Sequence, residues 1–192
     1  MTTGADSAHM ARALQLAARG RYGAHPNPMV GCVIVRDGTV VGEGWHAQAG
    51  EAHAEIHALE AAGDAARGAT AYVTLEPCAH HGKTPPCADA LVEAGVSRVV
   101  VAMQDPYEEV AGRGLARLLE AGIDAEVGLM QSAAEALNEG FIGRVTHGRP
   151  FVRLKVAASL DGATAMESGE SQWITGDAAR RDVQSLRAAC GA

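Results

Sequence analysis

The chain has 192 residues, enough for one complete hydrophobic core with an additional segment but short for two full domains. Hydrophobic residues make up 47% of the chain and charged residues 20%, a composition that excludes an intrinsically disordered protein. A formal net charge of -7, without any run of Lys and Arg, argues against a nucleic-acid partner. The first residues, 1–9, are polar, and no apolar run approaches the ~20 residues of a membrane-spanning helix, so we expect a cytoplasmic protein without a membrane partner.

In chain order, the first predicted element is a helix that Ser7 caps and that ends near residue 20, where apolar side chains recur at helical spacing. Two β-rich runs follow, 30–36 and 39–46. The pair Asp37-Gly38 between these runs is typical of a two-residue hairpin turn. The sequence therefore predicts a β-hairpin after the first helix.

Helical and strand patterns alternate over the next part of the chain. They comprise a helix over 53–62, a strand over 70–75, a helix over 87–94, a strand over 97–103, a helix over 114–121, a strand over 124–128 and a helix over 131–138. Such alternation after a hairpin predicts a layered α/β/α domain with a mixed sheet. We expect this domain to cover residues 1–148.

A second segment follows the chain breaker Gly148-Arg149-Pro150. Residues 151–159 alternate between apolar and polar side chains and predict a strand, and residues 171–187 predict a loop followed by a helix. About forty residues cannot bury a core of their own. We therefore predict a short second part of the chain over residues 149–192.

Three metal-binding side chains fall at junctions between predicted elements. His53 begins the helix over 53–62, Cys78 follows the strand over 70–75, and Cys87 opens the next helix. One nitrogen and two sulfur donors favour zinc over hard cations, and three protein ligands leave the fourth tetrahedral position for a water that the metal activates. Since four cysteines are too few for a disulfide framework in this chain, metal or packing roles come first. We predict a catalytic Zn²⁺ site at His53, Cys78 and Cys87.

Glu55 lies two residues after His53, where a carboxyl group can protonate a ring nitrogen and then a departing amine. His-x-Glu followed by Pro-Cys and a second Cys is the pattern of zinc nucleobase deaminases, in which the Glu is an acid and base and not a ligand. The spacing departs from that pattern, because eight residues rather than two separate Cys78 from Cys87. Glu55 is the predicted catalytic residue.

This longer insert and its surroundings resemble a known family. Residues 77–87, PCAHHGKTPPC, are similar to the deaminase domain of the bifunctional riboflavin-biosynthesis deaminase/reductase. The same holds for residues 26–32, PNPMVGC, and for residues 42–46, GEGWH, that lead to His-Ala-Glu at 53–55. Residues 154–162, LKVAASLDG, look like the opening strand of that family's reductase domain, and SQWITG at 171–176 follows in the family's order.

The resemblance implies a cytidine-deaminase-like domain followed by the first part of a dihydrofolate-reductase-like domain. It implies hydrolytic deamination of 2,5-diamino-6-hydroxy-4-(5-phosphoribosylamino)pyrimidine to 5-amino-6-(5-phosphoribosylamino)uracil in riboflavin biosynthesis. The expected partner is thus a small phosphorylated pyrimidine, and a homo-oligomer is compatible with the sequence. The family's second domain reduces the ribose with NADPH. We expect this cofactor only if the reductase domain were complete, and we interpret residues 149–192 as a truncated segment of it.

The resemblance also implies ligand-binding residues. In the first domain Asn27, His46, His80 and Lys83 match positions that hold the pyrimidine and the phosphate of the substrate. Lys83 and His80 suit a phosphate, and Asn27 suits an amide-like ring edge. In the second segment, Lys155, Ser171 and Arg187 match substrate positions, and Ala157 and Trp173 match NADP positions. Trp173 could equally be an exposed aromatic residue that covers a small core.

Other interpretations of these residues stay open. The paired cysteines could be buried apolar residues, as we expect for Cys32 inside an apolar strand, and a structural zinc could take His80 or His81 as its fourth ligand. His57 lies one turn after the first metal-binding histidine, but the spacing does not fit His-Glu-x-x-His, so we expect it to pack or to donate a hydrogen bond. Another zinc-dependent deaminase, of cytidine, deoxycytidylate or guanine, is the alternative enzyme. A non-enzymatic zinc module would leave Glu55 without a role.

Overall fold

The computed structural model describes residues 2–80, 85–108 and 110–190. The chain divides into two compact units, Met1–Pro150 (unit 1) and Phe151–Ala192 (unit 2). Unit 1 contains α1 (Gly4–Ala17), β1 (Gly31–Arg36), β2 (Thr39–Trp45), α2 (Ala54–Ala62), β3 (Thr70–Val73), α3 (Cys87–Ala94), β4 (Arg98–Val101), α4 (Arg113–Glu120), β5 (Asp124–Val127), α5 (Gln131–Leu137) and α6 (Glu139–His147), with short 3-10 helices at Ala18–Tyr22 and Gly63–Ala66. Unit 2 contains α7 (Asp177–Ala188).

The strands of unit 1 form one five-stranded sheet in the order β2-β1-β3-β4-β5. β1 pairs antiparallel with β2 and with β3, whereas β3, β4 and β5 run parallel. The antiparallel part is the predicted hairpin, and the parallel part is connected through α3 and α4. The predicted mixed sheet is therefore confirmed.

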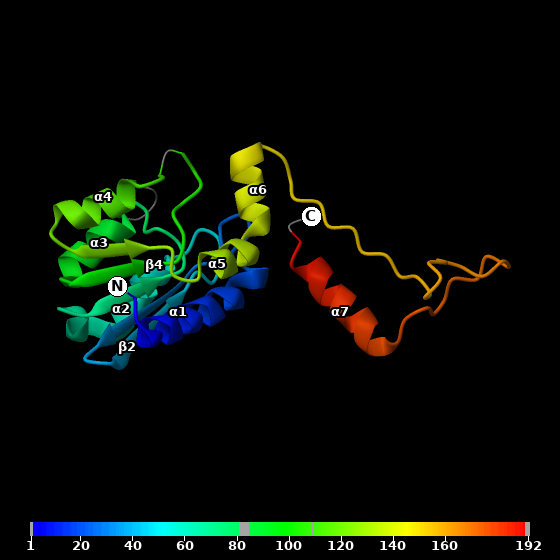
Figure 1. Cartoon of the computed structure of the whole chain (residues 1–192), viewed down its shortest axis with the longest axis horizontal. Coiled ribbons are helices and arrows are strands. Elements are labelled where there is room, and N and C mark those ends of the chain that lie inside the picture. The colour runs from blue at the N-terminus through cyan, green and yellow to red at the C-terminus, as the bar shows by residue number, and fades with distance from the viewer. Residues whose placement is uncertain (1, 81–84, 109, 191–192) are drawn as a thin grey trace. The chain divides into compact units, whose positions relative to one another are not determined.

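Helices cover both faces of this sheet (Figure 1). Gly31 and Cys32 are neighbours in β1 and so face opposite sides. A Cβ atom on Gly31 would lie 2.0 Å from the Ala13 carbonyl oxygen, because α1 packs directly on that side. Cys32 is paired with Gly44, where a Cβ atom would lie 2.2 Å from the Ala54 carbonyl oxygen of α2. Glycines thus let both helices approach the sheet closely, and the predicted α/β/α layering is confirmed.

The first helix begins earlier than predicted. Thr3, not Ser7, is its N-cap: the Thr3 hydroxyl accepts a hydrogen bond from the Asp6 N–H at 3.3 Å, and Asp6 Oδ2 accepts one from the Thr3 N–H at 2.6 Å. The other oxygen of Asp6 accepts hydrogen bonds from Tyr72 at 2.6 Å and from Arg98 at 2.8 Å. These contacts with β3 and β4 fix the start of α1, and they join residues that are far apart in the sequence.

α6 is a helix that the sequence pattern did not predict. It begins immediately after α5, and Asn138 is its N-cap residue. None of its residues is fully buried, although Ile142 packs against the core. Side-chain hydrogen bonds to residues 26–29 also hold this end of unit 1 in place.

Unit 2 is held by few apolar contacts. No described side chain after residue 150 is fully buried, and Val152 and Leu154 are 82% and 85% exposed. The strand predicted over residues 151–159 is wrong, since these residues pair with no strand that the structure describes. The predicted loop and helix over 171–187 correspond to a loop and α7. Apolar alternation alone cannot make a strand without a neighbouring strand to accept its backbone hydrogen bonds. Across the described residues of both units, no helix combines the length and the apolarity that crossing a membrane requires.

Candidate active site

The three predicted metal-binding side chains meet beyond the carboxyl end of β3. His53 is the N-cap residue of α2, Cys87 is the first residue of α3, and Cys78 follows β3 after the four residues 74–77. The backbone N–H groups of Cys87 and Ala88 at the start of α3 have no partner within their own helix. They donate to Cys78, to its Sγ at 3.3 Å and to its carbonyl oxygen at 3.1 Å. Cys78 therefore caps α3 and is held beside the second cysteine.

The spacing of the donor atoms fits a tetrahedral zinc ion. The ligand atoms of His53, Cys78 and Cys87 all lie within 4.8 Å of one another. His53 Nδ1 lies 3.2 Å from the Cys87 Sγ and 3.7 Å from the Cys78 Sγ. Zinc bonds of about 2.1 Å to nitrogen and 2.3 Å to sulfur, at a tetrahedral angle, separate the two atoms by about 3.6 Å. These residues could therefore hold zinc with little rearrangement.

The electrostatics of the two thiols also suit a metal. Hydrogen bonds from the Cys87 thiol, from the His53 ring and from the Cys87 N–H lower the pKa of Cys78 to about 4, although burial opposes this shift. The contact with Cys78 raises the pKa of Cys87, so the pair readily gives up one proton and retains the second. Cysteine binds zinc as the thiolate, and binding removes both protons.

Glu55 lies in the first turn of α2 and is only 3% exposed. Burial raises its pKa to about 7; the nearby His53 ring opposes this shift and Cys78 adds to it. Cys32 is fully buried on β1, where burial and the charge of Glu55 raise the pKa of its thiol. Glu55 is thus a buried carboxyl group beside the three donor atoms, in an environment that favours proton uptake at neutral pH.

His46 and Asn27 form a second layer next to these donors. The His46 ring packs edge-on against the His53 ring, with 5.5 Å between the centroids. His46 Nδ1 lies 3.2 Å from the Ala52 carbonyl oxygen, and because a carbonyl can only accept, this ring nitrogen donates. Burial lowers the pKa of His46, so its other nitrogen accepts a hydrogen bond from Asn27 Nδ2 at 3.1 Å. Of these two side chains, His46 is buried and Asn27 is exposed.

The remaining predicted residues of unit 1 lie around this cluster or outside the described part of the chain. His80 is exposed two residues after Cys78. Lys83 and His81 belong to residues 81–84, which lie outside the described residues. His57 Nδ1 lies 3.8 Å from a Glu60 carboxylate oxygen, and the His57 side chain is 39% exposed.

Glu76 was missed by the sequence reasoning, although it stands just before Pro77-Cys78. It is 3% exposed and accepts hydrogen bonds from four backbone N–H groups. The donors are Asp105 at 3.2 Å, Gly112 at 3.0 Å, Gly114 at 2.9 Å and Leu115 at 3.2 Å. Glu76 thereby joins the segment that carries Cys78 to the loop and helix after β4. Only an acidic residue in an otherwise buried stretch hinted at this role in the sequence.

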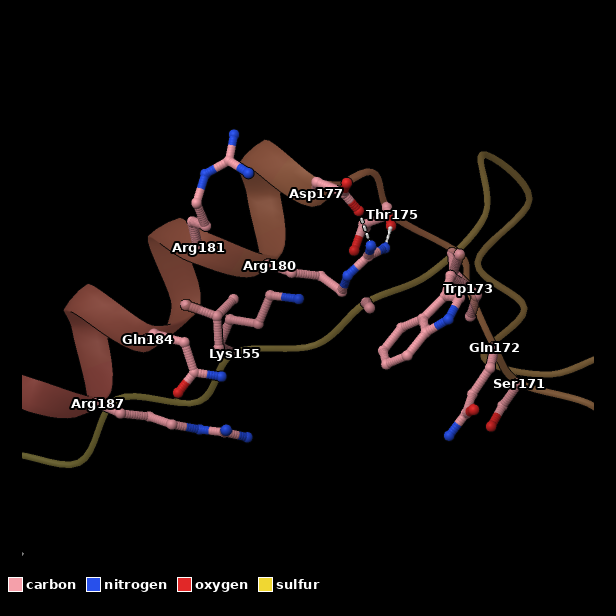
Figure 2. A pocket seen from close by; sticks show the side chains of 13 residues that line it. Lys155, Ser171, Gln172, Trp173, Thr175, Asp177, Arg180, Arg181, Gln184 and Arg187 are labelled. Carbon is pink, nitrogen blue, oxygen red and sulfur yellow. Dashed lines mark hydrogen bonds and ion pairs between the residues drawn. The ribbon is translucent and has the colours of Figure 1, made fainter.

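In unit 2, all five predicted ligand residues line one open cavity of about 710 Å³. These are Lys155, Ala157, Ser171, Trp173 and Arg187. In Figure 2, Lys155, Arg180 and Arg187 lie beside the helix that lines this cavity, and Trp173 lies farther along the cavity, away from Lys155 and Arg187. The Arg180 guanidinium also lies over the Trp173 ring, 4.4 Å from its centroid, and forms an ion pair with Asp177. The cavity is thus rich in cationic side chains, and two of them, Arg180 and Arg181, were not predicted.

The chain is similar over nearly all of its length to riboflavin-biosynthesis proteins. It is 67% identical over 183 residues to riboflavin biosynthesis protein RibD of Escherichia coli (strain K12), which covers 95% of this chain and 50% of that protein. The structure of Acinetobacter baumannii RibD superposes with a TM-score of 0.92 at 58% identity, covering 97% of this chain and 52% of that one. A diaminohydroxyphosphoribosylaminopyrimidine deaminase/5-amino-6-(5-phosphoribosylamino)uracil reductase from Thermotoga maritima gives a TM-score of 0.90 at 44% identity, covering 95% and 53%. The resemblance to the bifunctional family is confirmed, and the chain spans about half the length of these relatives.

Two family models match successive parts of the chain. The RibD C-terminal domain matches residues 150–192. The cytidine and deoxycytidylate deaminase zinc-binding region matches residues 3–103, which include all three donor side chains and Glu55. This match and the His-Cys-Cys group confirm the predicted zinc cofactor. The chain therefore belongs to the family of the cytidine and deoxycytidylate deaminase zinc-binding region.

Proposed function

We propose that this protein is a zinc-dependent deaminase of an aminopyrimidine that carries a phosphoribosylamino group. The reaction is hydrolysis of 2,5-diamino-6-hydroxy-4-(5-phosphoribosylamino)pyrimidine to 5-amino-6-(5-phosphoribosylamino)uracil and ammonia. The observation that carries the proposal is the buried Glu55 carboxyl group beside the donor atoms of His53, Cys78 and Cys87. The RibD relatives support the choice of substrate over other pyrimidines.

The proposed mechanism assigns a separate task to each group. His53, Cys78 and Cys87 would hold zinc, which supplies a Lewis acid and an activated water when bound. Glu55 accepts one proton from water and delivers it to the ring nitrogen; it then takes the second proton from the hydroxyl group added at the ring carbon and delivers it to the leaving amine. A C–O bond forms at the ring carbon, the C–N bond breaks and ammonia departs. Glu55 ends in its starting protonation state, so the cycle needs no further acid or base.

The substrate would be oriented by residues around this centre. With its Nδ2 bound to His46, Asn27 can offer its side-chain oxygen to an N–H group of the pyrimidine. His46 would fix Asn27 and line the ring pocket, and His80 and Lys83 would take the phosphate. An exposed histidine and a lysine suit that part of the substrate, because the phosphate stays solvated until it binds.

Unit 2 fits a phosphorylated ligand as well. We propose that residues 149–192 are a segment of a reductase domain and that residues 1–148 are the deaminase domain. In the unit 2 cavity, Lys155, Ser171 and Arg187 would contact the substrate, and Ala157 and Trp173 would contact NADP. NADPH as a cofactor depends on a complete reductase domain. A cytoplasmic location and a homo-oligomer also stay predictions.

Ammonia release from a panel of substrates tests the proposal. The zinc-loaded full chain should release ammonia from the phosphoribosylamino pyrimidine and far more slowly from its dephosphorylated analogue, cytidine, deoxycytidylate and guanine. Faster turnover of any of the last three would favour the alternative deaminase, which the 67% identity to a RibD protein does not favour. No ammonia from any substrate, with zinc bound, would contradict the proposal.

A further inference from the structure

The loop that carries Asn27 lies between the first 3-10 helix and β1, and the Asn27 N–H donates to the Ala24 carbonyl oxygen at 2.8 Å. Asn27 is exposed, and its Nδ2 donates to the Nε2 of His46 at 3.1 Å. His46 is in turn fixed by the Ala52 carbonyl oxygen at 3.2 Å and by the edge of the His53 ring. A displacement of Asn27 would therefore act on the layer next to the metal-binding residues.

Two side chains from the end of unit 1 hold this loop on either side of Asn27. Asn138 Oδ1 accepts a hydrogen bond from the Met29 N–H at 2.8 Å, and Asn138 Nδ2 donates to the Met29 carbonyl oxygen at 3.0 Å. Arg144 Nη2 donates to the Pro26 carbonyl oxygen at 2.9 Å. These contacts join residues that are 109 and 118 positions apart. The loop is thus fixed from α6 and its N-cap.

The contact between Asn138 and Met29 has the form of a backbone pair. One carboxamide satisfies both the N–H and the C=O of a single residue, as a neighbouring strand would. Asn138 is only 4% exposed, and its amide also lies 3.4 Å from the Ala134 carbonyl oxygen of α5. Asp could accept from the Met29 N–H but would repel the Met29 carbonyl oxygen. The geometry therefore requires the amide.

We propose that Asn138, assisted by Arg144, is a positioning residue for the substrate: it sets the place of Asn27 beside His46 through the backbone of Pro26 and Met29. The role of Asn27 in binding the pyrimidine rests on the proposed function. Small misplacements of a binding group of about 1 Å can cost about 10²-fold in rate. Residues at the junction of α5 and α6 thus belong to the specificity of the deaminase centre, although they touch neither metal nor substrate.

The first test is independent of activity. The zinc-loaded full chain is compared with Asn138→Ala and Arg144→Ala by NMR of the His46 ring and the Asn27 side-chain amide. The matched control is Tyr72→Phe, which removes a different buried hydrogen bond, from Tyr72 to Asp6 at 2.6 Å. We expect the His46 and Asn27 signals to shift in Asn138→Ala and Arg144→Ala and to stay in place in Tyr72→Phe. All three variants should retain zinc. Unchanged signals in both α6 variants would overturn the proposal, whether or not the chain deaminates.

The second test uses turnover of the phosphoribosylamino pyrimidine. Asn138→Ala should raise KM by about 10-fold, the factor expected when the hydrogen bond between Asn27 and the pyrimidine is lost, and kcat should change less. Arg144→Ala should also raise KM. Since Arg144 is exposed, we expect this variant to fold, so it tests the inference even when Asn138→Ala does not fold. Asn138→Asp should raise KM at least as much as Asn138→Ala, because the retained contact with the Met29 N–H is offset by repulsion between the carboxylate and the Met29 carbonyl oxygen. A KM within twofold of wild type in the α6 variants would overturn the inference, whereas failure of the wild-type chain to release ammonia would overturn the proposed function.

Discussion

Replacing Glu76 with Gln tests how the segment before Cys78 is held in place. Oε1 of Glu76 accepts from Gly114 and Leu115, and Oε2 accepts from Asp105 and Gly112. Gln has one side-chain carbonyl oxygen, which keeps two of these hydrogen bonds. Its NH₂ group cannot accept, so the other two N–H donors lose their partner. A hydrogen bond to a charged group contributes about 1.5–3 kcal/mol, so losing two should lower the free energy of unfolding by ~3–6 kcal/mol.

Urea denaturation of the zinc-loaded full chain, followed by circular dichroism, measures this loss. The matched control is Glu43→Gln, which makes the same chemical change in an ion pair with Arg12 at the surface, 2.7 Å between Nε and Oε1. Exposed pairs are worth less than about 1 kcal/mol, so this control should unfold close to wild type. A loss below ~1 kcal/mol in Glu76→Gln, equal to the control, would refute the reasoning.

Three further outcomes are expected. Cys78→Ser should lose most of its zinc by metal analysis, because a hydroxyl is a poor zinc ligand, and full retention would contradict the assignment. Burial opposes ionisation of Asp6, but hydrogen bonds from Tyr72 and Arg98 outweigh it and hold the pKa of Asp6 well below its usual range. Wild type should therefore have a higher free energy of unfolding than Asp6→Asn, with the largest difference above pH ~4 and a smaller one as the pH falls further. A difference that does not change with pH in urea titrations would count against this. Lys83→Ala should raise KM for the phosphorylated substrate far more than for its dephosphorylated analogue, and equal losses would make Lys83 structural.

The sheet and most of the helices could be predicted because their signals are local. The two β-rich runs around Asp37-Gly38 form β1 and β2, and the alternation after residue 53 produces the helices and strands that follow. The three donor side chains could be placed at element junctions for the same reason. Their convergence follows from topology, since the carboxyl end of β3 and the starts of α2 and α3 adjoin in a layered fold.

What the sequence did not reveal depends on contacts between distant residues. Thr3 rather than Ser7 caps α1 because Thr3 and Asp6 form a reciprocal capping box, a local signal that the sequence reasoning overlooked, and Asp6 also binds side chains of β3 and β4. Asn138 and Glu76 bind backbone groups 109 and up to 39 positions away, and no local pattern marks such partners. Residues 151–159 show the opposite error, because a local strand pattern forms a strand only when a neighbouring strand is available.

Ammonia release by Glu55→Gln is the measurement that tests the central claim most directly. The variant keeps the size of the side chain and leaves His53, Cys78 and Cys87 unchanged, so it should bind about one zinc per chain, as we expect of wild type. Deamination should fall by at least ~10²-fold, the low end for loss of a positioned acid and base. Retained zinc with that loss of turnover is the result the account predicts, and near-normal ammonia release by Glu55→Gln would contradict it.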